Sequence, residues 1–281
     1  MRALPASSLL CVAAALCPGL CAADVSAAPT TTPAPPAGQG DRLMLSASGS
    51  RLTGTSGGGG GLAGWLHEVN PRALIGVMAN YQTIADSHWT FGSLIGALTG
   101  GGQPSQQWSL SGELHEGSGR IGTHAFDYSI ASVGFSHALT DELSLQLEER
   151  QIDVDTTHGS LPKVGLSMLW NRQWLAVASY ANSVGGNLGT DLGTVRVDYF
   201  RQTLDILAGG AVGRIAPAVV NLQGAVQPGA KQMREVFVGV SQGYSRADWM
   251  LLADYLDVSG SKRITLTLNC TVHMRAFSHS R

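Results

Sequence analysis

Polar and apolar residues alternate without exception from Arg263 to Met274, near the end of the chain. In the stretch RITLTLNCTVHM the apolar residues all share one parity and the polar residues share the other. A helix would spread both sets around its circumference, whereas a pleated strand sends alternate side chains to opposite faces. The pattern therefore predicts a β-strand with one apolar face and one polar face.

The same two-faced pattern recurs upstream from Arg42 and predicts about fourteen strands, most of them close to the roughly nine to eleven residues that a tilted strand needs to cross a bilayer. The expected spans are 42–53, 62–70, 73–84, 88–99, 107–116, 123–137, 142–152, 163–170, 173–182, 191–200, 203–213, 235–243, 247–257 and 262–274. A chain of this kind has almost no room for helices, so the sequence predicts an all-β fold.

The connections between these strands alternate in length. After even-numbered strands they are mostly tight, as at 71–72 and 171–172. After odd-numbered strands they are mostly longer or rich in glycine, at 56–61, 117–122, 153–162, 185–190 and 215–234. Barrels of outer membranes have short periplasmic turns and longer extracellular loops, so the alternation favours a membrane barrel. The longest connection, 215–234, either folds into or over a pore or is an exposed loop.

Aromatic residues gather near the strand ends. Trp108, Phe135, Trp170, Trp174, Tyr199, Tyr244 and Trp249 lie near the tight turns, and Tyr81, Trp89, Phe126, Tyr180 and Tyr255 lie near the opposite ends. Amphipathic rings collect at both membrane–water boundaries, so this placement predicts two aromatic belts around a spanning barrel.

The composition indicates that part of the protein's outer surface does not face water. Charged residues make up 14% of the chain, against roughly 25% in ordinary soluble domains. The mean hydropathy is only +0.08, which excludes a bundle of spanning helices. The formal net charge of -2 provides no basic surface for nucleic acid.

The first residues have the order of a secretory signal: Arg2, an apolar run from Leu9 to Leu20, and then small residues. We expect residues 1–27 to be a signal peptide, residues 28–40 to be a flexible Pro/Thr/Ala-rich periplasmic lead-in, and residues 41–277 to form the barrel. Removal of the signal leaves Cys270 as the single cysteine, so no disulfide framework is expected.

Taken together, the signal sequence, the alternating strands from Arg42 to Met274 and the turn pattern resemble bacterial outer-membrane β-barrel proteins of the porin and export-channel kind. The resemblance implies a transmembrane antiparallel up-and-down β-barrel of about 14 strands, with a range of about 12 to 16. It further implies a place in the bacterial outer membrane, with membrane lipid and the barrel-assembly machinery as partners. The last residues, Ser278 to Arg281, depart from the terminal aromatic residue that is usual in this class.

If the apolar faces point to lipid, the opposite faces line the interior. The expected lumen-lining residues are Glu113, Asp127, Glu148, Arg150, Arg196, Asp198, Asp205, Asp248 and Asp254, accompanied by His115 and His273. Charges of both signs on facing strands can filter solutes, or they can pair across the lumen and close it. The sequence leaves both roles open.

No other chemistry stands out. Gly117 to Gly122 matches G-x-G-x-x-G, but it leads into a strand rather than a helix, so no nucleotide site is expected. Adjacent pairs such as Ser136 and His137 point to opposite faces, and we expect no catalytic, metal or cofactor site. The sequence predicts a passive channel for small polar solutes or an exported polysaccharide. The alternatives are a closed structural or surface-interaction barrel and an outer-membrane rim hydrolase.

Overall fold

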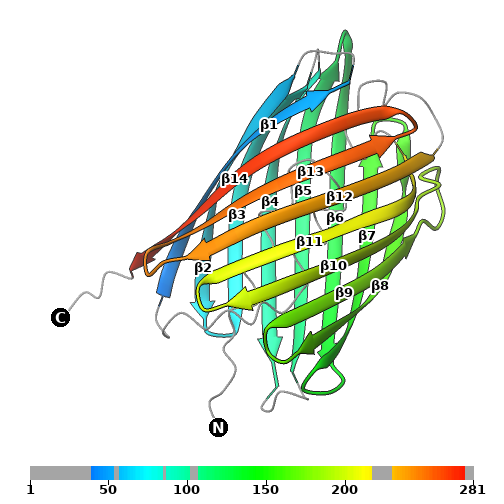
Figure 1. The fold of residues 1–281 in the computed structure, drawn as a ribbon. Helices are drawn as coiled ribbons and strands as arrows, with labels where there is room; N and C mark the ends of the chain where they lie inside the picture. Colours follow the sequence, from blue (N-terminus) through cyan, green and yellow to red (C-terminus); the bar gives the residue numbers. More distant parts are fainter. Residues whose placement is uncertain (1–38, 54–56, 85–86, 102–106, 217–229, 276–281) are drawn as a thin grey trace.

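A computed structural model describes residues 39–53, 57–84, 87–101, 107–216 and 230–275. Fourteen antiparallel strands follow one another around a single closed sheet, and β1 completes the ring by pairing with β14 (Figure 1). The strands are β1 (Gln39–Leu52), β2 (Gly58–Asn70), β3 (Ala73–Ile84), β4 (Ser87–Gly100), β5 (Trp108–Ile121), β6 (His124–Ala138), β7 (Leu143–Val154), β8 (Thr157–Trp170), β9 (Trp174–Asn182), β10 (Asp191–Arg201), β11 (Leu204–Ile215), β12 (Lys231–Gly243), β13 (Ala247–Val258) and β14 (Ser261–Arg275). The predicted fold class and strand number are confirmed.

The closing pair fixes the two ends of the barrel. Gln39 pairs with Arg275, and Leu52 pairs with Arg263, so β1 begins where β14 ends. We call this end the near rim and the opposite end, where β1 ends and β14 begins, the far rim. The predicted signal peptide and all but Gln39 and Gly40 of the predicted lead-in lie outside the described residues. Among the described residues, no helix is long and apolar enough to cross a membrane.

The alternation on β14 separates its two faces as predicted. Ile264 and Leu266 are 60% and 53% exposed, whereas Arg263 and Thr265 are each 1% exposed. In a closed sheet the side chains on the inner face are the ones that lose access to solvent, so the apolar parity points outward and the polar parity points inward. An outward apolar face and an inward polar face are the arrangement of a barrel bathed in lipid.

The two faces exchange polarity part of the way along β7. Near the middle of the strand Leu147 is 44% exposed and faces outward, while Glu148 faces inward. Toward the far rim the order reverses: Ile152 and Val154 are 3% and 5% exposed on the inside, and Asp153 is exposed on the outside. The far end of this strand therefore has the polarity of a water-soluble barrel, with a polar exterior and an apolar interior.

The same exchange on β4 and β6 corrects part of the predicted aromatic belts. Trp89 is only 4% exposed, and Phe126 packs against a buried interior cluster, so neither ring faces a membrane boundary. Trp170, Tyr180 and Trp249 do face outward and are 64%, 52% and 45% exposed. An end position along a strand did not reveal which face each ring occupies.

Two expected loops turn out to be strands. Residues 117–121 belong to β5, and the segment 153–162 is a hairpin in which β7 and β8 are joined by residues 155–156 alone. Gly117 and Gly119 do not form a turn. A methyl group at Gly117 would lie 2.1 Å from the Thr90 carbonyl oxygen, and one at Gly119 would lie 2.5 Å from the Phe126 ring. These glycines therefore permit close packing inside the wall, and the predicted length asymmetry between the two rims is wrong at these connections.

Candidate functional site

The interior of the barrel gathers most of the charged residues that the sequence placed there. Inward register positions are occupied by Glu113, Glu148, Arg150, Arg196, Asp198, Asp205, Asp248 and Asp254. Asp127 is the exception and corrects the prediction. It is exposed and pairs in register with the exposed Ser118, while its neighbours Phe126 and Tyr128 pack against the interior cluster. The cause is the exchange of polarity near the far rim, which turns polar residues of β6 outward.

Glu148 is the centre of a compact ion-pair group on β7 and β8. One carboxylate oxygen lies 2.6 Å from Arg150 Nη2, and the other lies 2.5 Å from Lys163 Nζ. The three side chains are only 17%, 15% and 12% exposed. Attraction between such charges is stronger at a partly buried site than in bulk water, so this group stiffens the wall as well as giving the interior a polar surface.

A second group lies on β10 and β11. Arg196 donates to Asp198 Oδ2 through Nε at 3.1 Å and Nη2 at 2.8 Å, and both residues are buried. Asp205 follows on the next strand and accepts a hydrogen bond from the Ser241 hydroxyl at 3.3 Å. Asp198 is thus bonded to a residue of its own strand, and Asp205 is bonded across to β12.

Arg263 is the most deeply buried cation of the described interior, with 1% of its surface exposed. Its guanidinium interacts electrostatically with the carboxylates of Asp254 and Glu235 on the two preceding strands. The predicted interior set omitted both Arg263 and Glu235. Their parity was the available signal, because Arg263 alternates with Ile264 and Glu235 alternates with the outward Val236.

The strands that close the ring contribute two more pairs. Arg42 Nη2 lies 3.5 Å from Glu68, and His273 Nε2 lies 2.8 Å from Asp248. These contacts link β1 to β2 and β13 to β14 near the near rim. Each strand of the closing pair is therefore bonded through a polar side chain to its other neighbour, β1 to β2 and β14 to β13.

Ser93, His115 and Glu113 form a hydrogen-bonded row on β4 and β5. Ser93 Oγ lies 2.6 Å from His115 Nδ1, and His115 Nε2 lies 3.1 Å from Glu113 Oε2. The sequence pointed to His115 and Glu113 but missed Ser93, which only the β4–β5 register brings opposite His115. Acyl transfer would also need free hydrogen-bond donors for an oxyanion. The backbone on both sides of Ser93 is committed to the ladders with β3 and β5.

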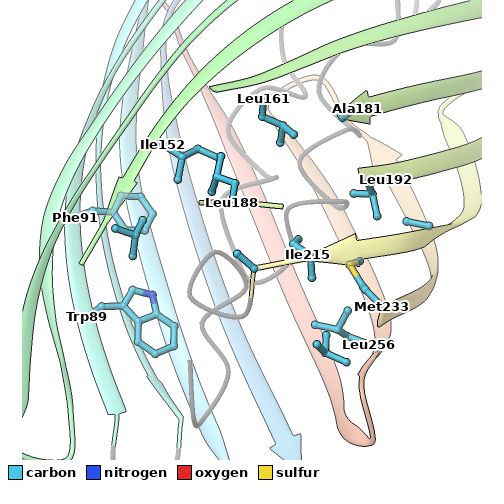
Figure 2. Close-up of a cluster of buried hydrophobic side chains, with 14 of the residues drawn as sticks. Trp89, Phe91, Ile152, Leu161, Ala181, Leu188, Leu192, Ile215, Met233 and Leu256 are labelled. Carbon is cyan, nitrogen blue, oxygen red and sulfur yellow. The ribbon is translucent and has the colours of Figure 1, made fainter. Parts of the chain in front are cut away.

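The interior near the far rim is apolar rather than charged. We call this cluster the apolar layer, and its buried members are Leu52, Trp89, Phe91, Ile152, Val154, Leu161, Ala181, Leu188, Leu192, Ala211, Ile215, Ala216, Met233, Leu256 and Val258. Figure 2 shows these side chains projecting from facing parts of the wall toward Leu188 and Ile215. The sequence did not predict this layer, because its residues alternate with polar ones just as lipid-facing residues do.

Leu188, like Ala216, belongs to a connection and not to a strand. The link of residues 183–190 between β9 and β10 carries it into the interior, where it is 0% exposed. Asn187 fastens this link to the β7–β8 turn: its Oδ1 accepts from the His158 amide at 2.8 Å, and its Nδ2 donates to the Thr156 carbonyl at 2.7 Å. The link is therefore fastened to the β7–β8 hairpin and places Leu188 in the apolar layer.

The long connection that the sequence singled out at 215–234 is described only in part. Ile215 ends β11 and Ala216 follows it, and both are buried in the apolar layer. Residues 231–234 belong to β12. The remainder, residues 217–229, lies outside the described residues, so whether the connection folds over the pore stays a prediction.

Outside the barrel interior, the described residues offer less developed sites. A cavity of about 1040 Å³ is lined by residues of β3 to β7, among them the outward Glu116, Asp127 and Asp153. Within the described ranges no group of three or more His, Cys, Asp or Glu side chains is arranged to hold a metal ion. The interior thus remains the candidate site with the most developed geometry.

No protein-family model matches the chain, and no curated protein matches it. Several solved structures are similar to it in fold. The CymD monoaromatic hydrocarbon channel has a TM-score of 0.60 and 10% sequence identity, over 85% of this chain and 90% of that chain. The Pseudomonas putida toluene transporter TodX has a TM-score of 0.53 and 10% identity, over 84% and 90%. A bacterial polysaccharide outer-membrane secretin has a TM-score of 0.55 and 8% identity, over 84% and 99%. At such low identity the likeness concerns the fold, which is that of bacterial outer-membrane β-barrel channels, as the sequence had indicated.

Proposed function

We propose that this protein is a passive channel in the outer membrane of a bacterium. The observation that carries the proposal is the two-sided wall: apolar residues such as Leu266 face outward while Thr265, Thr267 and the ion-paired charges face inward. Lipid accommodates the first face, and water and polar solutes accommodate the second. The proteins with a similar fold that are described as channels or transporters support the same function.

For the solute, a small polar molecule or an exported polysaccharide agrees with the polar inner face of β14 and with the ion-paired groups. The similarity to a polysaccharide secretin supports the second possibility. In this proposal Glu113, Glu148, Arg150, Arg196, Asp198, Asp205, Asp248 and Asp254 line the path. Six of these eight residues are acidic and two are basic, so they form a polar surface with an excess of negative charge, which suits hydroxyl-rich solutes as well as ions.

The proposal includes location and assembly. The chain is exported by an N-terminal signal, inserted by the barrel-assembly machinery and oriented with the near rim toward the periplasm, so the far rim is extracellular. We further propose that it is not an enzyme, which agrees with the commitment of the Ser93 backbone to the ladders with β3 and β5.

A closed barrel with a structural or surface-interaction role is the second candidate. It is favoured by the apolar layer, in which Leu188, Met233 and Leu256 are all 0% exposed. Side chains packed to this degree obstruct the passage of water and ions.

Planar-bilayer recording of the refolded protein distinguishes the two candidates. A channel gives discrete current steps in the wild-type protein, or in a variant whose apolar layer has been opened. A closed structural barrel gives no current in either protein, although both are folded.

A further inference from the structure

We propose that the link of residues 183–190 is an internal plug, and that its Leu188 side chain occupies a binding site for the apolar group of a small amphipathic solute. This inference rests on the proposed channel function and adds the class of molecule that the apolar layer accepts. Leu188 is the internal occupant of the site, and the strand residues around it form the site itself.

The wall around Leu188 is shaped to receive an apolar group. Ile152, Leu161, Leu192 and Met233 come from four different strands and belong to the same buried cluster, in which Leu188 lies beside Ile152 (Figure 2). Gly159 completes the seat, because a methyl group at that position would lie 2.9 Å from Leu188 Cδ1. The walls come from the continuous sheet, whereas the side chain that fills the space is carried on a separate segment.

That segment is held less firmly than the wall. Its inward position depends on the two side-chain hydrogen bonds of Asn187, on the backbone bonds of Asn187 to His158 and of Val184 to Ser160, and on the Thr190 hydroxyl, which accepts from the Ala216 amide. Gly185 and Gly186 have φ angles of +69° and +60°, a region that glycine adopts at little cost. Displacing the link breaks these few contacts, whereas opening the wall would break the continuous ladders on both sides of a strand. The link can therefore move while the barrel stays closed.

The surroundings define the chemistry of a replacement for Leu188. A polar group placed among these side chains would lose its hydration without gaining partners, so the site favours an aromatic ring or a short alkyl group. Charged residues begin directly beside it, because Leu161 pairs in register with Arg150, and Leu256 pairs with both Glu235 and Arg263. A solute with an apolar group and a polar head matches both surfaces at once.

Block of ionic current by two matched sugars tests this site. Phenyl β-glucoside and methyl β-glucoside share a polar head and differ in the apolar group. In Leu188→Ala the site loses its internal occupant, so phenyl glucoside should half-block the current at a concentration about tenfold lower than in wild type. Methyl glucoside should block both proteins alike. Val184→Ala is the matched control, because Val184 lies in the same link but is 60% exposed.

A second variant separates a loosened plug from an enlarged cavity. Asn187→Ala removes both side-chain tethers and leaves Leu188 intact, so it should strengthen the block by phenyl glucoside severalfold. Asn182→Ala, at the exposed end of β9, should not change it. Heat-modifiable gel migration and circular dichroism establish that each variant is folded.

The outcomes are distinguishable. Equal block by the two glucosides in a conducting Leu188→Ala protein overturns the inferred site and leaves the channel proposal intact. The inferred site is also overturned if Val184→Ala gains as much affinity as Leu188→Ala. Absence of current in wild type and in both link variants, all of them folded, rejects the channel and the inference together.

Discussion

Polar and apolar residues alternate in the same way in the middle of β7 and at its far end, but the faces that they occupy are exchanged. In the middle, Leu147 faces outward and Glu148 is paired in the interior; at the far end, Asp153 faces outward and Ile152 and Val154 are buried inside. The alternation along a strand shows that its two faces differ in polarity. Whether the apolar face points outward or inward depends on whether lipid or water surrounds the barrel. In the membrane channel proposed above, this contrast would place the far end of β7 beyond the lipid, over an apolar interior of its own.

Substitution of an interior charged residue should cause the largest loss of stability. Arg263→Ala leaves the buried carboxylates of Asp254 and Glu235 without their cation, and we expect it to lower the free energy of unfolding by about 3–5 kcal/mol. Urea titration in lipid vesicles, followed by tryptophan fluorescence, measures the change. Arg51→Ala is the control, since Arg51 pairs in register with Ile264 on the outer face and is exposed. Equal losses in the two variants would show that Arg263 is not buried among charges.

Substitution within the apolar layer should cause the second-largest loss of stability. Leu256→Ala empties space in a region where Leu256 is 0% exposed, so the expected loss is about 3 kcal/mol. Leu251→Ala removes the same atoms from the outer face of the same strand, where the side chain is 42% exposed. Because lipid fills the space that is left, the loss there should be about 1 kcal/mol. The same urea titration compares the two, and a larger loss for Leu251→Ala would contradict a packed interior.

The third-largest effect is expected from charged residues placed on the outer face. Their cost should differ between the part of the wall proposed to face lipid and the far end of the barrel. Leu268→Arg places a charge on the outer face of β14, where we expect a cost of about 2 kcal/mol. Gln151→Arg, on the outer face of β7 beyond the exchange of polarity, should cost almost nothing, because water surrounds it. Refolding yield into vesicles and the urea midpoint are the measurements. Similar costs at both positions would remove the boundary proposed between the two levels.

The smallest effect is expected at Arg214. Its guanidinium donates to Asp191 on the outer face and is exposed, and a solvated pair of this kind contributes little. Arg214→Gln should leave the urea midpoint unchanged in low and in high salt. A clear loss that persists in high salt would indicate that this pair is shielded from water.

The sequence correctly predicted the features that follow from the alternation of side chains along a strand. The strand number, the faces of β14 and the inward charges from Glu113 to Asp254, apart from Asp127, all follow from parity together with the assumption of lipid outside. Trp170 and Trp249 also face outward, as the belt prediction required. These features depend on neighbours along a single strand.

The remainder depended on the outside medium or on neighbouring strands. Asp127, Trp89 and Phe126 were assigned as though lipid surrounded the whole barrel, although their strand ends lie where the polarity is exchanged. Ser93 meets His115 only through the register of β4 with β5. Gly117 was interpreted as part of a turn because the close approach of Thr90 cannot be seen in a single strand. The burial of Leu188 likewise requires a connection to fold inward, and the alternation along the strands does not predict the path of a connection.

Lipid quenching of single-tryptophan proteins tests the two-sided wall most directly. Two proteins retain only Trp65 or only Trp89, with the other tryptophans replaced by phenylalanine, and each is refolded into vesicles of brominated lipid. Trp65 is 37% exposed on the outer face and should be strongly quenched, whereas Trp89, 4% exposed among the interior side chains, should keep its fluorescence. Equal quenching of the two, or stronger quenching of Trp89, would contradict a barrel with lipid outside and the apolar layer within.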